Sequence, residues 1–234
     1  MTSVLLAVTG SDHWTLADGT KHPCGYWPEE LVAPHQIFSA AGFDVTIATP
    51  GAVRPTPDEA GFTPEMNGGS AAAGQELRAY IDTISAELDR VVALEELDPA
   101  DYQLVFIPGG HGPMEDLAVS ASFGAQLNQF LAAGAFVAAV CHGAAGLLAA
   151  RAADGSWAFD GYQLTGFTNA EETQVGFADR APWLLQDRLT ADGGVFSGGA
   201  PWEPKVIVDR TLITGQNPAS SVPLAEALVT ALTT

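Results

Sequence analysis

The chain has 234 residues, and 47% of them are hydrophobic, which is enough for one α/β domain with a sizeable core. Its net charge of −19, with only nine lysines and arginines, argues against nucleic acid as a partner, because phosphate binding needs clustered cations. No apolar run reaches the roughly 18–20 residues of a membrane span, which argues against a membrane protein. Only two cysteines, Cys24 and Cys141, are present, so we expect a reducing, cytoplasmic setting without a disulfide framework.

Strand and helix signals alternate along the chain. Short, continuous apolar runs are typical of buried parallel strands, and longer runs followed by glycine are typical of helices. In chain order, the expected elements are strand Val4–Val8, helix Glu30–Ala41, strand Asp44–Ala48, strand Leu104–Ile107, helix Phe123–Ala133, strand Ala135–Val140, helix Gly143–Ala152, a hairpin of Val206–Val208 with Leu212–Thr214, and helix Leu224–Leu232. This alternation predicts a three-layer α/β fold with a mostly parallel sheet and helices on both faces.

The stretch 51–99 breaks the rhythm. It begins as a loop rich in proline and glycine and then carries a helical pattern near Gln75–Leu88. We interpret it as a small insertion packed over one edge of a single domain that spans residues 1–234.

The strongest local signal is the turn Ala139-Val140-Cys141-His142-Gly143, where a buried strand runs directly into a helix. This is the arrangement of a nucleophile elbow, with cysteine as the presented residue. The carboxyl end of such a strand faces the crevice where α/β sheets bind ligands. The positive end of the helix also favours a thiolate. An inert buried cysteine is the alternative, and the adjoining histidine and glycine argue against it.

A second turn, Pro108-Gly109-Gly110-His111-Gly112, follows another expected strand. Its glycines permit a tight turn whose amides can point at an oxyanion, although a glycine cluster also occurs in ordinary loops. Two further segments give weaker evidence of a functional role. Glu29 and Glu30 at the start of the first helix can serve as helix-dipole partners. Thr168 and Asn169 can cap a helix ahead of Glu171 and Glu172.

Together these segments resemble the ThiJ/PfpI superfamily, which shares a flavodoxin-like fold with class I glutamine amidotransferases. The resemblance rests on the two turns and on Thr165-Gly166-Phe167-Thr168. The segments Gly25–Pro34 and Thr214–Ser221 resemble one branch of it, which holds heat-shock chaperones and glutathione-independent glyoxalases.

The resemblance implies a role for individual residues. Cys141 matches the nucleophile, His142 its neighbouring histidine, and Glu172 the third member of a triad, with Glu171 as the alternative. Glu30 matches a buried glutamate that hydrogen-bonds the cysteine. The turn of Gly109, Gly110 and His111 is expected to bind substrate, with the amides of Gly110 and His142 as oxyanion donors. Cys24 is either a resolving thiol for an oxidised Cys141 or a small filler.

The resemblance also implies a homodimer and a reaction that needs no metal or other cofactor. The leading hypothesis is a glyoxalase that converts methylglyoxal and water to lactate. A holding chaperone or redox-stress protein is the first alternative. A hydrolase or hydratase with another small substrate is the second. Glutamine amidotransferase activity itself is not expected, because that class keeps its triad histidine far from the cysteine in sequence.

Overall fold

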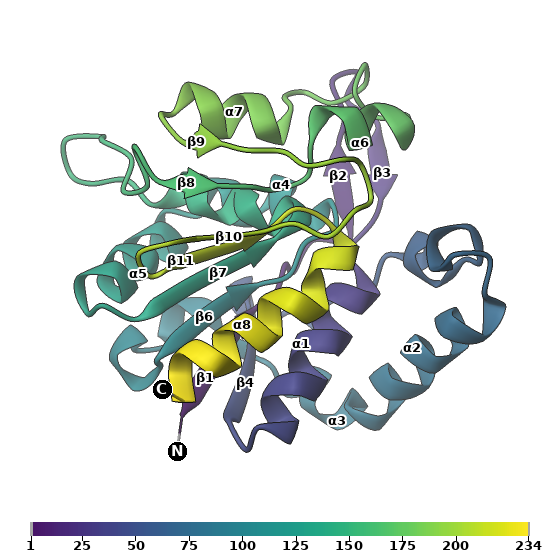
Figure 1. Ribbon diagram of the computed structural model, residues 1–234, viewed down its shortest axis with the longest axis horizontal. Coiled ribbons are helices and arrows are strands. Elements are labelled where there is room, and N and C mark those ends of the chain that lie inside the picture. Colours follow the sequence, from purple (N-terminus) through teal and green to yellow (C-terminus); the bar gives the residue numbers. More distant parts are fainter. Residues whose placement is uncertain (1, 234) are drawn as a thin grey trace.

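A seven-stranded sheet forms the centre of the protein (Figure 1). The computed structural model describes residues 2–233. The strand order is β10-β11-β7-β6-β1-β4-β5, and all neighbours are parallel except the hairpin of β10 and β11. The strands of this sheet are β1 (Ser3–Ala7), β4 (Asp44–Thr49), β5 (Val92–Ala93), β6 (Leu104–Ile107), β7 (Phe136–Val140), β10 (Val206–Asp209) and β11 (Leu212–Gly215). The mostly parallel sheet confirms the expected fold class.

Helices cover both faces of this sheet, which gives the expected three layers. Figure 1 shows α1 and α8 side by side on the near face, with α5 behind β7. The helices are α1 (Pro28–Ala40), α2 (Ala71–Thr83), α3 (Ser85–Leu88), α4 (Gly112–Glu115), α5 (Ala121–Ala132), α6 (Asn169–Gln174), α7 (Leu185–Ala191) and α8 (Ser221–Thr233). Among residues 2–233, none of the helices combines the length and the apolar character that crossing a bilayer demands.

Two small sheets lie outside the expected pattern. One pairs β2 (His13–Thr15) with β3 (Lys21–Pro23) in antiparallel fashion, and the other pairs β8 (Gln163–Leu164) with β9 (Val195–Phe196) in parallel fashion. Strands of two or three residues carry too few side chains to produce a readable alternation, so periodicity does not reveal them.

Two of the helices expected from the sequence take a different form in the structure. The segment expected as helix 143–152 is a 3₁₀ helix, η7 (Cys141–Ala149), which begins at the cysteine itself. Its glycines pack against the sheet, since a Cβ on Gly143 would lie 2.2 Å from the carbonyl oxygen of Ile107. The helix expected near 75–88 is two helices, α2 and α3, which are separated at Ile84. The insertion therefore folds as several short elements, and α2 packs against α1, where Nδ1 of His35 lies 2.9 Å from the hydroxyl oxygen of Tyr80.

The register of the central strands places the functional loops at one edge. Ile107 is level with Ala139 on the neighbouring strand, and Val140 is level with Gly215. Because these strands are parallel, the segments that follow β6, β7 and β11 leave the sheet side by side. The glycine turn at 108–112, the cysteine at 141 and the segment 216–220 are brought together for this reason.

The packing of α5 against η7 can be tested at Gly124. A Cβ at this position would lie 1.9 Å from the carbonyl oxygen of Ala149, so Gly124→Ala forces the two segments apart. We expect this substitution to lower the free energy of unfolding by about 1–3 kcal/mol. Helix propensity alone would raise it by about 1 kcal/mol. Urea unfolding of the variant measures the sign directly.

The neighbouring exposed position supplies the control. Ala125→Gly on the same helix should cost only the ordinary propensity difference of about 0.5–1 kcal/mol. A stabilised Gly124→Ala protein would contradict the close packing of α5 on η7.

Candidate active site

Cys141 stands at the junction of β7 and η7 with an unusual backbone conformation. Its φ is 57°, in the left-handed region that non-glycine residues rarely adopt. Such a conformation costs about 1–3 kcal/mol and persists only where the surroundings enforce it. The side chain is buried, with 4% of its surface exposed. A strained strand-to-helix turn that presents one residue is the geometry of a nucleophile elbow, as expected for this segment.

A chain of polar contacts leads from the thiol to Glu172. The Nδ1 atom of His142 lies 3.4 Å from Sγ of Cys141, and its Nε2 atom lies 2.6 Å from Oε2 of Glu172. Burial would raise the pKa of Glu172, but the imidazoles of His142 and His111 outweigh it and hold that pKa well below its usual range. Glu172 is therefore an ionised acceptor at neutral pH. The structure brings together the three residues expected to form a triad.

His111 is a second imidazole on the same carboxylate. Its Nε2 atom lies 3.0 Å from Oε1 of Glu172, and its ring stacks on Trp14 with centroids 4.7 Å apart. Since an ionised carboxylate only accepts, both Nε2 atoms must carry the hydrogen. A neutral His142 then has its lone pair on Nδ1, which faces the sulfur. Sequence reasoning assigned His111 to substrate binding and did not foresee its contact with Glu172.

Glu30 lies on the other side of the cysteine, in the first turn of α1. It is fully buried, and its Oε2 atom accepts a hydrogen bond of 2.7 Å from the amide of Gly109. Burial raises the pKa of this carboxyl well above its usual value, although the Cys141 thiol and the Gly109 amide oppose the shift. We therefore expect Glu30 to be a neutral acid at neutral pH.

The thiol and Glu30 must be considered together. Burial raises the pKa of Cys141, an ionised Glu30 would raise it further, and the amide of His142 lowers it. With Glu30 protonated, the repulsion between like charges is absent and the carboxyl can donate a hydrogen bond to the thiolate. The expected pairing of Glu30 with the cysteine has a physical reason in this neutral acid.

The amides of the glycine turn divide into two roles. Gly110 has φ 85°, and no hydrogen bond from its amide to any group in residues 2–233 is found. Its amide is therefore free to donate, and the expected role as an oxyanion donor stays a prediction. Gly109 was expected to bind substrate as part of the same turn, and its amide donates to Glu30. Gly109 therefore supports Glu30 rather than an oxyanion.

A small cavity of ≈ 40 Å³ lies above the cysteine, which is space for a molecule of a few heavy atoms. Its lining includes Cys141, His142, Gly110 and His111, together with aromatic and aliphatic side chains of distant segments. Those further residues are Trp27, Met66, Phe167, Val175, Trp202 and Pro218. Sequence reasoning missed Met66 and Trp202, because Met66 lies in a short 3₁₀ helix (Glu65–Asn67) and Trp202 in a turn, and tertiary packing decides the position of both.

Glu171 is also buried, but it faces away from the histidines. Its Oε2 atom accepts hydrogen bonds from the amide and hydroxyl of Thr168, and its Oε1 atom accepts from Asn217, Gln216 and the amide of Trp202. Thr168 and Glu171 form a capping box at the start of α6. The Thr-x-x-Glu spacing is a sequence signal for this arrangement, and it leaves Glu172 as the acid of the triad.

Cys24 is buried and does not line the cavity around Cys141. Burial and nearby carboxylates raise the pKa of its thiol well above the ordinary value. A thiol of this kind is a poor nucleophile, so its surroundings favour the role of a small filler over that of a resolving thiol.

Among residues 2–233, one group of side chains could hold a metal ion. His111, His142 and Glu172 offer ligand atoms that lie within 4.8 Å of one another. Two imidazoles and one carboxylate are a set that zinc accepts. The same atoms form the hydrogen bonds described above, so an ion would have to displace both Nε2 hydrogens.

The fold and the site define a class of α/β proteins that present a buried cysteine on a strained turn beside a histidine. The DJ-1/PfpI family matches residues 25–231, and the chain belongs to this family.

Individual relatives include proteins with assigned activities. Glyoxalase 3 of Candida albicans is 27% identical over 99% of this chain and 98% of that protein. The crystal structure of glyoxalase III from the same organism superimposes with a TM-score of 0.84, at 25% identity over 98% of this chain and 97% of the other. The human glutamine amidotransferase-like class 1 domain-containing protein 1 is 39% identical over 58% of this chain, and the match spans 62% of that relative, less than two thirds of its length.

The neutral state of Glu30 can be tested through the reactivity of Cys141. In Glu30→Gln, the amide keeps both an acceptor for Gly109 and a donor for sulfur. We therefore expect the pH midpoint of iodoacetamide alkylation to stay close to that of the parent protein. In Glu30→Leu, the donor is lost and the midpoint should rise, because the thiolate loses its hydrogen bond. Mass spectrometry distinguishes alkylation at Cys141 from that at Cys24.

The opposite outcome would show that Glu30 is ionised. Removal of its charge would then lower the midpoint in both variants, since repulsion of the thiolate would be relieved. Urea unfolding should also show a loss of about 1–3 kcal/mol in Glu30→Leu, where the buried Gly109 amide is left without its acceptor.

Glu171 offers a second test, of the network behind the site. Glu171→Gln retains the shape of the side chain but replaces one acceptor atom with a donor. At least one buried donor then loses its partner, which should cost about 1–3 kcal/mol in urea unfolding. Glu172→Gln is the comparison, because it removes a carboxylate of similar burial without touching Trp202. We expect the quenching of tryptophan fluorescence by acrylamide to increase only in Glu171→Gln.

Proposed function

We propose that the protein is a cysteine-dependent glyoxalase that needs no added cofactor and converts methylglyoxal and water to lactate. The single observation that carries this proposal is the Cys141–His142–Glu172 arrangement beneath a cavity that holds only a few heavy atoms. The similarity to a protein named glyoxalase 3 over almost the whole chain supports the same activity.

The reaction begins with addition of the Cys141 thiolate to the aldehyde carbon of methylglyoxal. A carbon–sulfur bond forms, and the carbonyl oxygen becomes the oxyanion of a hemithioacetal. The amides of Gly110 and His142 are proposed to hold this charge, since fixed donors stabilise an oxyanion without reorganisation. The free amide of Gly110 supports this role.

A proton must then move from the former aldehyde carbon to the neighbouring carbonyl carbon. This transfer passes through an enediol and leaves a thioester of lactate. Glu30 and His142 are the two candidate carriers. His142 lines the cavity, whereas Glu30 does not, which favours His142 as the base. The ionised Glu172 stabilises the imidazolium that forms and keeps the ring in its orientation.

Water completes the reaction by attack on the thioester carbon. The carbon–sulfur bond breaks, lactate leaves, and Cys141 returns as the thiolate. One molecule of methylglyoxal and one of water thus give one molecule of lactic acid, with no external oxidant or reductant.

The two cysteines of the chain provide a matched test. Cys141→Ala should lower the rate of lactate formation from methylglyoxal by at least about 10³-fold, because no other nucleophile stands beneath the cavity. Cys24→Ala should retain activity, since Cys24 lies outside that cavity. Lactate formed from methylglyoxal is measured enzymatically, and the panel also contains glyoxal and phenylglyoxal, whose products in the same reaction are glycolate and mandelate. Lactate production by Cys141→Ala at the parental rate would contradict the mechanism.

The same variant separates the alternatives that the family resemblance raises. A holding chaperone would protect a heat-denatured client protein equally well with Cys141→Ala and without α-oxoaldehyde turnover. A hydrolase or hydratase would depend on Cys141 but would fail on every α-oxoaldehyde of the panel. The homodimer and the cytoplasmic location stay predictions.

A further inference from the structure

A second, larger hollow opens beside the cavity of Cys141. It has a volume of ≈ 760 Å³ and lies between α1, the insertion and the segment that begins α8. We call it the side groove. Helical spacing explains its walls, because Glu29, Val32 and Gln36 share one face of α1, and Ala73, Glu76 and Leu77 share one face of α2. Its volume is that of a ligand site, whereas the cavity above the thiol is far smaller.

The side groove and the cavity adjoin each other. Both are lined by Trp27, Met66, Trp202 and Pro218, so these four residues form the boundary between them. A group that reaches Cys141 from the side groove must pass the two indole rings. The shared residues place the side groove beside the reactive end of the protein rather than on a separate surface.

The charge of the side groove has a single sign. Glu29, Glu65 and Glu76 line it, and no lysine or arginine is among the lining residues. Within residues 2–233, none of these three carboxylates takes part in a hydrogen bond or an ion pair that the structure records. Glu29 is half-buried, and burial raises the pKa of its carboxyl. An unpartnered carboxylate in such a position gains from a cation, which would restore the interactions lost on burial.

The aromatic side chains favour the same kind of ligand. Indole rings attract ammonium and guanidinium groups through their faces, and their apolar bodies pack against aliphatic stems. Trp202 is 37% exposed at this boundary, which is a large exposed area for a tryptophan. Lysine and arginine combine an aliphatic stem with a cationic end, and a polypeptide carries such side chains on a backbone long enough to follow the side groove.

From this combination we propose that the side groove binds a polypeptide segment bearing lysine or arginine, with the cation beside Glu29, Glu65 and Glu76. The segment would approach the cavity of Cys141 across Trp27 and Trp202. Anionic ligands, including nucleic acid, would be repelled by the same carboxylates. Binding does not require the reaction at Cys141, so the proposal stands or falls independently of the glyoxalase activity.

The experiment is calorimetric titration of the full chain with the blocked peptide acetyl-Gly-Lys-Gly-Lys-Gly-amide at low salt. The same peptide with glutamate in place of lysine is the negative probe. We expect binding of the lysine peptide alone. The substitutions Glu65→Gln and Glu76→Gln together should weaken it by about tenfold, as should Glu29→Gln, with further weakening at high salt.

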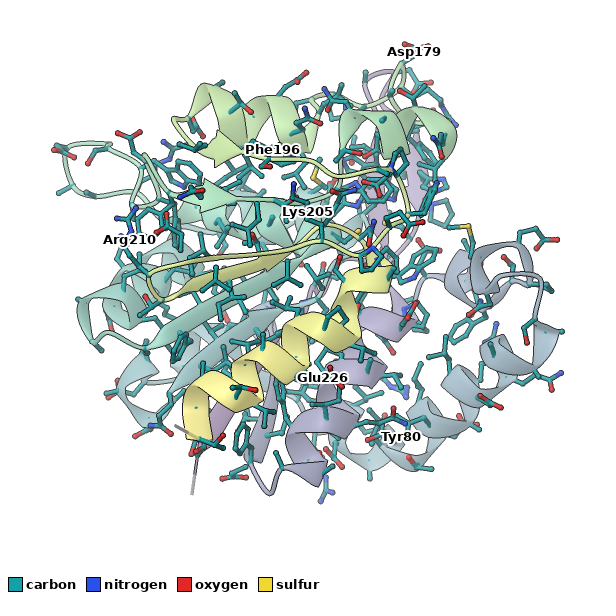
Figure 2. The ribbon with its side chains drawn as sticks, in the orientation of Figure 1. Tyr80, Asp179, Phe196, Lys205, Arg210 and Glu226 are labelled. Atoms are coloured by element: carbon teal, nitrogen blue, oxygen red, sulfur yellow. The ribbon has the colours of Figure 1, made fainter. Side chains whose placement is uncertain are left out.

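The acidic character of the whole protein demands a matched control. The double variant Asp179→Asn with Glu226→Gln removes two negative charges, as the Glu65 and Glu76 variant does, but from exposed positions that do not line the side groove. Figure 2 shows Asp179 at the upper end of the molecule and Glu226 on α8. This control should bind the lysine peptide as the parent does. An equal loss in the control, equal binding of the glutamate peptide, or no binding at all would each overturn the proposal.

Discussion

The left-handed backbone of Cys141 is the constraint on which the rest of the site depends. With φ at 57°, the chain turns sharply out of β7, and the thiol is directed into the crevice at the sheet edge instead of continuing the strand. The turn is held from below, because Gly143 lies against the carbonyl of Ile107 with no room for a side chain. The strain of about 1–3 kcal/mol is offset by the packing of η7 on β6 and α5. Without this turn, the sulfur atom would not lie close to both His142 and the Gly110 amide.

Two buried carboxyl groups act on that sulfur, Glu30 from its own side and Glu172 through His142, and their pKa values are shifted in opposite directions. Glu30 accepts a hydrogen bond from one backbone amide and has no cation beside it within residues 2–233, so burial raises its pKa and favours the neutral acid. Glu172 contacts two imidazoles, which keep it ionised in spite of burial. The neutral acid avoids repulsion of a thiolate, and the ionised acid supports a histidine that gains a proton. Groups whose surroundings move their pKa values apart are typical of sites that transfer protons.

Behind these residues, Glu171 connects three segments that are distant in sequence. It joins the cap of α6 to the loop that carries Trp202 and to Gln216 and Asn217 after β11. Two adjacent glutamates thus have separate tasks because successive residues of a helix point about 100° apart. Glu172 meets the histidines, while Glu171 holds the wall of the cavity and the boundary of the side groove.

The sequence by itself determined the fold class, the cysteine turn and the order of the segments around it. These are local properties, since apolar runs, glycines and the Cys-His pair lie within short stretches of chain, and parallel strands align their carboxyl ends. Tertiary structure alone decided that His111 shares Glu172, that Gly109 serves Glu30, and that Met66 and Trp202 line the cavity. Each of these contacts joins residues from separate segments. The spacing of residues along one segment holds no information about the rotation or packing of another, so such contacts appear only when the chain is folded.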